Sequence, residues 1–260
     1  METTISQGII EAYFRKLSKH LNNDVIIAGG GPSGLIAAYK LAKQGYQVAL
    51  FEKKLAPGGG MWGGAMMFNE IIVQKPATHI LDELEITYYN YKDDLYTFDS
   101  VEATSSLIYH AVKAGVVIFN CITVEDIILK SERVAGLVVN WQPVATQKMH
   151  VDPLMIAARV TVDSSGHPSE IVSFLEKKNG VTLATKTGKI IGEGSLDVVQ
   201  GEKGTVNNSG CVFPGLYVSG MAANNVHGQN RMGPIFGGML LSGLKVANQI
   251  DDELKEGNNG

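Results

Sequence analysis

Three glycines near the start of the chain have a spacing that could hold a phosphate group. Gly29, Gly31 and Gly34 form the pattern G-x-G-x-x-G. In such a pattern the first glycine permits a tight turn, the second lets the backbone approach a pyrophosphate, and the third lets a helix pack closely on a strand. The N-terminus of the helix that follows offers free N–H groups and the positive end of a dipole to the phosphates. We therefore predict a dinucleotide-binding site here.

Imidazole and carboxylate groups occur in two further stretches, where they could bind a metal ion. His150 and Asp152 are two residues apart, so in an extended segment their side chains point the same way. His167 follows a predicted strand, in the sequence SSGH. Imidazole and carboxylate together suit Fe, Mn, Co or Zn. From spacing alone, however, a histidine after a strand is more often a hydrogen-bonded structural residue than a metal ligand.

Arg231 lies in a glycine-rich loop just before the last predicted helix. Its planar fork of N–H donors can hold a carboxylate through two parallel hydrogen bonds. The alternative is a surface arginine that pairs with an acidic side chain. Because the surrounding residues leave the backbone so much freedom, we favour an anion site.

The elements around the glycine motif have the order that a dinucleotide site needs. An apolar run over 25–28 predicts a strand directly before the motif, and 35–42 predicts a helix directly after it. A second predicted strand, 47–51, ends in Glu52, at about the 20-residue distance expected for a ribose-binding acid. The glycine-rich loop 57–64 follows so closely that it should lie near the adenosine or ribose half of the ligand.

The rest of the chain alternates predicted strands and helices, which implies an α/β fold with a central parallel sheet. We expect one dinucleotide-binding domain over 1–260, with an antiparallel β insertion at about 120–160 and a frayed tail at 256–260. The other expected elements are helices at 5–20, 76–84, 100–114 (capped by Asp99 or Ser100), 169–178 and 234–253, strands at 116–120, 159–163 and 215–219, and a hairpin of 123–130 with 134–140.

The composition narrows the functional classes. The chain has 260 residues, of which 45% are hydrophobic, so a sizeable core is available. The net charge is −4 and no long basic run occurs, which argues against nucleic acid as the main partner. Cys121 and Cys211 lie far apart, which argues against a disulfide scaffold or a cysteine zinc site and suits a reducing cytoplasm. No apolar run is long enough to span a bilayer, so we expect no membrane partner.

Together these stretches resemble the archaeal and eukaryotic thiazole synthase family of thiamine biosynthesis. The resemblance covers nearly the whole chain, and its most specific part is NRMGPIFGGMLLSG at 230–243. It implies a glutathione-reductase-like Rossmann fold that binds NAD and not FAD. NAD is then a substrate, which loses nicotinamide before its ADP-ribose part condenses with glycine and sulfur to an ADP-thiazole carboxylate. The other matching motifs are GGGPSG at 29–34, FEKKLAPGGGMWGGAM at 51–66, HVDP at 150–153 and SSGH at 164–167.

The resemblance also implies roles for single residues. Asp152 and His167 match iron ligands, with Asp152 reaching a site shared with an adjacent subunit, and Arg231 matches the residue that holds the glycine carboxylate. The implied assembly is a homo-oligomer, which is a ring-like octamer in the family. The family's nucleotide-contacting positions match Ser33, Glu52, Lys53 and Gly60, and its further NAD contacts match Val124 and Met221.

One departure from the family pattern decides the expected source of sulfur. In the eukaryotic branch a cysteine two positions before the aspartate donates its own sulfur. Here that position is His150, and neither cysteine of the chain lies in the motif. The chain therefore resembles the archaeal branch, which uses free sulfide with Fe(II) and turns over repeatedly. We expect His150 to move protons, since imidazole titrates near neutral pH.

Other functions fit part of the sequence. An FAD-dependent oxidoreductase would use GGGPSG and Glu52 equally well, but it leaves HVDP, SSGH and Arg231 without a role. A non-catalytic nucleotide-binding protein would bind NAD and leave it intact. A sugar-phosphate isomerase would need a phosphate-sugar site, for which we find no separate motif.

Overall fold

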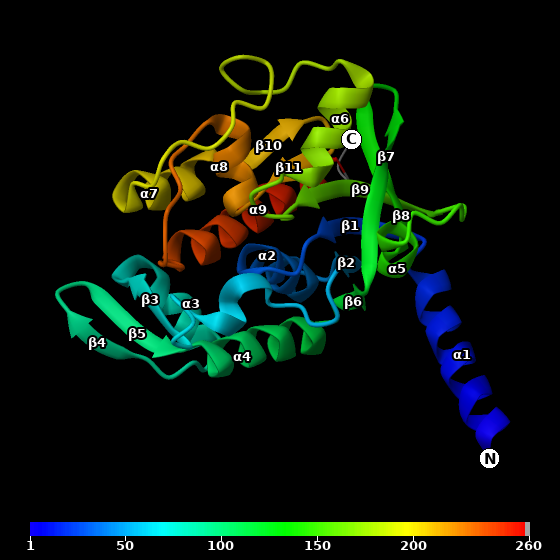
Figure 1. Ribbon diagram of the computed structural model, residues 1–260, viewed down its shortest axis with the longest axis horizontal. Helices are drawn as coiled ribbons and strands as arrows, with labels where there is room; N and C mark the ends of the chain where they lie inside the picture. Colours follow the sequence, from blue (N-terminus) through cyan, green and yellow to red (C-terminus); the bar gives the residue numbers. More distant parts are fainter. Residues whose placement is uncertain (258–260) are drawn as a thin grey trace.

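A central, mostly parallel sheet organises the computed structural model, which describes residues 1–257 (Figure 1). Helices cover one face of this sheet, and a β-hairpin with further helices covers the other. The predicted α/β fold class with a parallel sheet and an antiparallel part is confirmed. The parallel strands are β1 (Asn22–Ala28) at the centre, β2 (Val48–Glu52) and β6 (Val117–Asn120) on one side, and β9 (Leu154–Asp163) and β11 (Leu216–Val218) on the other, with antiparallel β10 (Gly210–Phe213) at the edge.

The predicted hairpin is present as β7 (Ile122–Lys130) and β8 (Arg133–Trp141), which pair antiparallel. Its turn residues Ser131 and Glu132 have φ angles of 49° and 56°, in the left-handed region. β8 continues onto the first half of β9, which pairs antiparallel with it from Leu154 to Ala157. The strand predicted at 159–163 therefore begins five residues earlier, because its first half has a partner that the sequence pattern does not announce.

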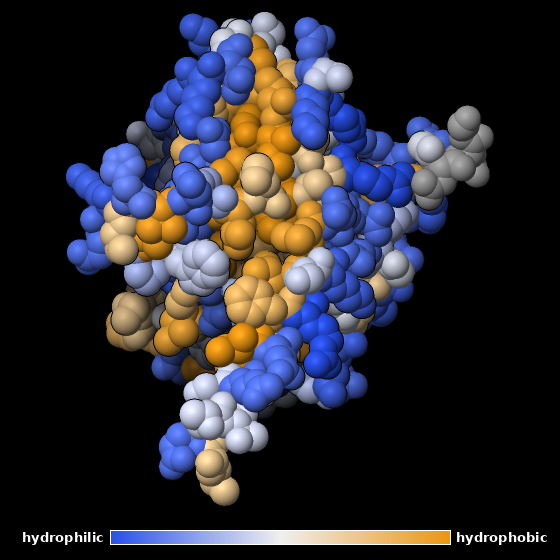
Figure 2. All heavy atoms as spheres, turned by 90° about the vertical axis from the view of Figure 1, so that its right-hand side faces the viewer, coloured by the Kyte–Doolittle hydropathy of each residue, from blue (hydrophilic) through white to orange (hydrophobic). Residues whose placement is uncertain are grey.

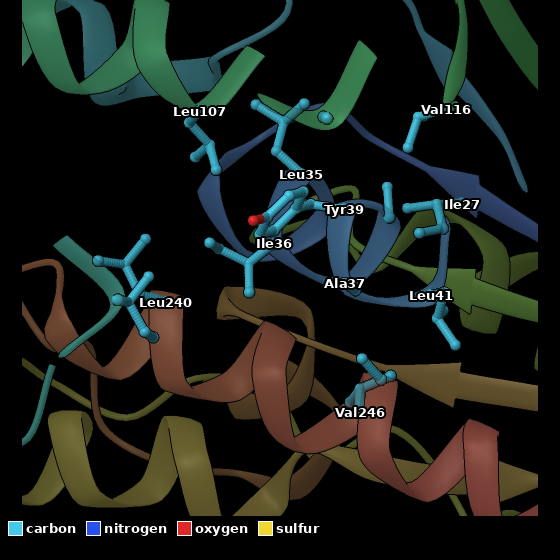
Figure 3. Close-up of a cluster of buried hydrophobic side chains, with 14 of the residues drawn as sticks. Ile27, Leu35, Ile36, Ala37, Tyr39, Leu41, Leu107, Val116, Leu240 and Val246 are labelled. Carbon is cyan, nitrogen blue, oxygen red and sulfur yellow. The ribbon is translucent and has the colours of Figure 1, made fainter. Parts of the chain in front are cut away.

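The two faces of β1 divide the core into two layers. Val25 and Ile27 belong to the layer beneath the helices α2 (Pro32–Lys43), α4 (Ser100–Lys113) and α9 (Gly237–Glu256). Ile26 and Ala28 belong to the layer beneath the hairpin. Figure 3 shows the first layer, in which side chains of α2 lie between those of α4 and α9. This strict alternation is what a strand buried on both faces requires.

Close backbone contact joins the glycine motif to the last helix. A Cβ added to Gly243 of α9 would lie 2.2 Å from the carbonyl oxygen of Ser33 in α2, so only glycine fits there. The start of α4 is fixed by Asp99, whose carboxylate accepts a hydrogen bond from the N–H of Glu102 at 2.7 Å. This confirms one of the two predicted caps. The remaining helices are α1 (Glu2–Lys19), α3 (Thr78–Glu83), α5 (Gln142–Thr146), α6 (Glu170–Asn179), α7 (Val198–Asn208) and α8 (Met221–His227), with short 3-10 turns at Gly59–Gly63 and Lys75–Ala77.

Several elements go beyond the predicted ones. A small antiparallel sheet of β3 (Glu70–Gln74), β5 (Leu95–Asp99) and β4 (Tyr89–Lys92) lies beside α4. All four residues of β4 are exposed, so no alternation marks it. Helices α7 and α8 and strand β10 are also absent from the prediction, while most of the predicted frayed tail, 258–260, lies outside the described residues.

Helix α7 forms although two glycines lower its intrinsic helix propensity. A Cβ on Gly201 would lie 2.6 Å from the Cα of Met232, and a Cβ on Gly204 would lie 2.1 Å from the Cγ of Gln229. The two glycines therefore let the helix lie directly on the 229–232 segment. Close tertiary packing explains a helix that local propensity argues against.

Helix α1 confirms the helix predicted at 5–20 but makes few contacts with its own chain. It extends away from the rest of the molecule (Figure 1), and Leu17 is its one buried residue. Ile5, Ile9 and Phe14 are each more than half exposed. Among the described residues no helix has the length and apolar character needed to cross a bilayer.

A buried carboxylate of α7 that contacts the start of α9 predicts pH-dependent stability. Glu202 is 4% exposed, and its Oε1 accepts a hydrogen bond from the N–H of Gly238 at 2.6 Å. Burial raises the pKa of Glu202 to about 7, and the hydrogen bond acts in the opposite direction. Because the folded chain then holds the proton more tightly than the unfolded chain, stability falls as the pH rises from about 4.5 towards 7.

We expect Glu202→Gln to remove this loss, which corresponds to about 3 kcal/mol at pH 8. Urea unfolding of both proteins at pH 5 and pH 8 measures it. The difference between the two pH values should shrink in the variant. If the free energy of unfolding changes between pH 5 and pH 8 by the same amount in both proteins, Glu202 does not cause the pH dependence.

Candidate active site at the carboxyl ends of the parallel strands

A cavity of about 410 Å³ opens where β1 and β9 end. In the sheet, Ala28 of β1 lies level with Asp163 of β9 on one side and with Phe51 of β2 on the other. The chain leaves these neighbouring strands in different directions, and such a switch point is where open α/β sheets bind ligands. Ala28, Phe51 and Ser164 line the cavity, so it occupies this position.

The glycine motif forms one wall of the cavity. Gly29 has φ +104°, and a Cβ there would lie 2.3 Å from the carbonyl oxygen of Ser164. Gly34 lies outside the cavity lining, because it packs against the carbonyl oxygen of Gly29, only 2.2 Å from where its Cβ would be. Gly31 is different, since a Cβ there would meet nothing within 4 Å. The open space faced by Gly31 is room for a ligand.

Glu52 ends β2 at the cavity and is 6% exposed. Its carboxylate accepts hydrogen bonds from the N–H of Gly30 at 2.9 Å and from the N–H of Lys54 at 2.7 Å. Each oxygen keeps a further lone pair with which it can accept from a ribose hydroxyl. Next to it, Lys53 forms an ion pair of 2.6 Å with Glu170 at the cavity rim.

The opposite wall is the SSGH loop, which Asp163 holds in place. The buried carboxylate of Asp163 accepts hydrogen bonds from the N–H and hydroxyl of Ser165 at 3.0 and 2.6 Å, and from the N–H groups of Ile171 and Val172 at 3.0 and 3.1 Å. Burial raises the pKa of Asp163, and these bonds act in the opposite direction. Because the last two donors belong to the first turn of α6, Asp163 ties the loop to the start of that helix.

His167 follows in this loop and lines the cavity. Its Nδ1 lies 2.7 and 2.8 Å from the two carboxylate oxygens of Glu193. Glu193 has no place in the sequence prediction, because the region from 186 to 210 shows no periodic pattern. The one sequence feature that sets Glu193 apart is its position between Gly192 and Gly194.

Most of the predicted nucleotide contacts meet at this cavity. The predicted cofactor residues that line it are Gly29, Gly31, Ser33, Glu52, Lys53, Gly60, Val124 and Met221. The cavity also brings in residues that the sequence analysis does not single out, namely Phe236 and Met239 of the 230–243 stretch.

Comparison with known proteins adds to this geometry. The model of the Thi4 family matches residues 6–236 of the chain. The chain belongs to the Thi4 family. This confirms the resemblance inferred from the motifs.

Two relatives and one solved structure show how closely the chain follows the Thi4 family. It is 54% identical to a thiamine thiazole synthase of Desulfosudis oleivorans over 98% of each chain. It is 50% identical to a thiamine thiazole synthase of Pyrococcus abyssi over 97% of this chain and 98% of the relative. The crystal structure of Thermovibrio ammonificans THI4 superposes with a TM-score of 0.96 at 52% identity, over 98% of this chain and 99% of the other. Fold and family are therefore shared over nearly the full length.

Besides Gly34, three predicted site residues of this Thi4 chain lie outside the cavity lining. Arg231 is exposed, and its side chain forms no ion pair within residues 1–257. The adjacent Met232 is buried with Met221, which places the start of the 230–243 stretch beside the cavity. His150 and Asp152 are exposed in the 149–153 loop before β9.

A metal site with several protein ligands does not form within the described part of one Thi4 chain, because no three His, Cys, Asp or Glu side chains come together there. The cavity nevertheless offers His167, and no hydrogen bond to its Nε2 is present in residues 1–257. A free imidazole nitrogen suits a divalent transition metal. An exposed carboxylate such as Asp152 can complete such a site from a second copy of the chain, so the residues fit a shared metal.

Proposed function

We propose that the chain is a thiamine thiazole synthase that converts NAD, glycine and free sulfide into ADP-5-ethyl-4-methylthiazole-2-carboxylate with Fe(II), as a transferase that consumes NAD. The observation that carries the proposal is that the nucleotide motif and His167 line the same cavity. The reaction needs this juxtaposition, because the sugar that reacts is part of the bound nucleotide. Similarity to thiamine thiazole synthases over nearly the whole chain favours this function over an FAD-dependent oxidoreductase.

The cavity walls would hold NAD by its ADP-ribose part. Gly31 leaves room for the pyrophosphate at the N-terminus of α2, where backbone N–H groups face the ligand. Glu52 accepts hydrogen bonds from ribose hydroxyls, and Val124 and Met221 supply apolar contact. Loss of nicotinamide then exposes the sugar carbon, and opening of the ring gives a carbonyl group that an amine can attack.

Arg231 would hold the second substrate. Its guanidinium binds the glycine carboxylate through two hydrogen bonds and turns the amine towards the sugar carbonyl. An arginine that forms no ion pair with residues 1–257 is available for such a ligand. The amine condenses with the carbonyl to an imine and releases water.

His167 and, from a second copy, Asp152 would hold Fe(II). Bound there, the metal supplies Lewis-acid chemistry and an open position for sulfide. External sulfide is required, since Cys121 and Cys211 lie on other segments than the 149–153 loop. His150 lies on the same loop as Asp152, so it would reach the same site and move protons there.

Exposed apolar surface supports a homo-oligomer, an octamer by family resemblance. Figure 2 shows a band of apolar atoms across the face that carries the hairpin and α1. A large exposed apolar patch on a protein usually marks a site of interaction with a partner. Large apolar side chains that are exposed include Trp141 at the end of β8, Met149, Val151 and Met155 in and just after the 149–153 loop, and Ile5, Ile9, Ile10 and Phe14 on α1. We place the assembled enzyme in the reducing cytoplasm.

The proposal is tested by incubating the protein without oxygen with NAD, glycine, sulfide and Fe(II), and by mass spectrometry of the products. We expect an adenylated thiazole in excess over enzyme. Bound NAD that stays intact would point to a nucleotide-binding protein without this activity. A yellow protein with flavin absorbance would point to the oxidoreductase.

A further inference from the structure

A carboxylate that the proposed reaction does not use holds His167. The Nδ1 atom of His167 lies within 2.8 Å of both carboxylate oxygens of Glu193. The Glu193 side chain is 15% exposed, whereas that of His167 is 50% exposed. The more buried and better fixed partner is thus the carboxylate, and it determines where the imidazole lies.

The chemistry of this pair fixes which nitrogen carries the proton. A carboxylate is an acceptor only, so Nδ1 of His167 must donate. In the neutral ring Nε2 then carries the lone pair, and among residues 1–257 nothing bonds to Nε2. His167 lines the cavity, so the nitrogen with the free lone pair is part of a side chain that borders the space for the ligand.

The backbone around Glu193 is itself anchored. The N–H of Gly192 donates to the carbonyl oxygen of Asn225 at 2.9 Å, and the N–H of Gly194 donates to that of Gln229 at 3.0 Å. Gly194 also pairs with Asn230 in a parallel bridge. The segment therefore lies along 225–231 as a short ladder, which limits how far Glu193 can move.

The same ladder reaches Arg231. Its N–H lies 3.4 Å from the carbonyl oxygen of Gly194, and its own carbonyl oxygen accepts from the N–H of Asp197 at 3.1 Å. One short stretch of chain, 192–197, thus carries Glu193, the partner of His167, and also contacts the backbone of Arg231. This stretch links the histidine that would bind a metal to the chain segment that carries the arginine.

We infer that Glu193 is a positioning residue, which holds His167 as its Nδ1–H form with Nε2 free to bind a divalent transition metal. This inference rests on the proposed function, since it needs a metal at His167. Metal-binding histidines commonly donate their other ring N–H to a carboxylate, and loss of such a partner costs about 10–100-fold in metal affinity. The anchored 192–197 segment gives Glu193 the rigidity that this role needs.

Metal affinity and the His167 tautomer test the inference without any turnover. Co(II) is titrated into the full-length protein and followed by its absorption, and 15N NMR of the metal-free protein reports which ring nitrogen is protonated. We expect Glu193→Gln to weaken Co(II) binding by about 10–100-fold and Glu193→Ala to shift His167 towards the Nε2–H form. His167→Ala should bind no Co(II) at this site.

Glu176→Gln is the matched control. Glu176 accepts a hydrogen bond from the N–H of Ile190 at 2.9 Å, which an amide oxygen can also accept, and it does not contact His167. Its Co(II) affinity and tautomer should equal those of the unaltered protein. Circular dichroism of each variant separates misfolding from a local effect.

The results distinguish the possible failures. Unchanged Co(II) affinity and unchanged tautomer in both Glu193 variants would overturn the inference. Complete loss of binding in Glu193→Gln with an unchanged tautomer would also overturn it, because Glu193 would then be a ligand. If the unaltered protein binds no Co(II), the proposed metal site fails, and the tautomer alone decides whether Glu193 orients the ring.

Discussion

Gly31→Ala is expected to fold as stably as the unaltered chain and to bind NAD about 100-fold more weakly, a difference of about 2.8 kcal/mol. A Cβ at Gly31 meets no protein atom within 4 Å, and the residue lines the cavity. The added methyl group would therefore take space from the ligand and from nothing else. Thermal unfolding measures the stability, and isothermal titration with NAD measures the affinity.

Gly34→Ala is the contrasting variant, three residues further along the same motif. There the Cβ would lie 2.2 Å from the carbonyl oxygen of Gly29 and 3.1 Å from the Cβ of Ser164. Backbone must move to admit it, so we expect a loss of about 4 kcal/mol or more in stability. Equal unfolding temperatures of the two variants would contradict the packing argument, and unaltered NAD binding by Gly31→Ala would contradict the placement of the ligand.

Arg231→Ala should lower kcat/KM for glycine by about 1000-fold, which corresponds to about 4 kcal/mol. The variant removes the only group that we assign to the glycine carboxylate. Arg231→Lys keeps the charge but loses the planar fork, so it should recover only part of the activity. Steady-state kinetics with varied glycine at saturating NAD gives both values.

NAD binding is the internal control for both arginine variants. Arg231 lies outside the cavity lining, so its loss should leave the affinity for NAD as it is. Because the side chain is exposed, folding should be unaffected as well. A variant that loses NAD and glycine together would place Arg231 at the nucleotide instead, and full activity would remove it from the site.

The sequence predicts those elements of the fold that depend on local sequence patterns. The strand–glycine–helix unit around Gly29 and the hairpin around Ser131 could be predicted, since turn chemistry and apolar periodicity lie within a few residues of each other. The first half of β9 and helix α7 could not be predicted from the sequence. They form because distant segments, β8 and 229–232, supply pairing and close packing.

The candidate site shows the same division. Motifs place Glu52 and His167 at the carboxyl ends of two predicted strands, and the structure brings both to one cavity. Glu193 comes from a stretch without periodicity, 26 residues after the histidine that it contacts. Side chains that act through such long-range contacts leave no spacing signal in the sequence. The roles of His150 and Asp152 depend on a second copy of the chain and stay predictions.

The two glycine-rich segments at the cavity, 29–34 and 57–64, could not be transplanted into another protein one at a time. The N–H of Gly58 donates to the carbonyl oxygen of Gly30 at 2.6 Å, and a Cβ on Gly59 would lie 3.2 Å from the Cα of Gly31. Backbone touches backbone between them, so a scaffold that receives one loop must receive the other. For protein engineering the two segments are one module. A library that varies one of them without the other will contain chains in which this backbone contact between them is lost.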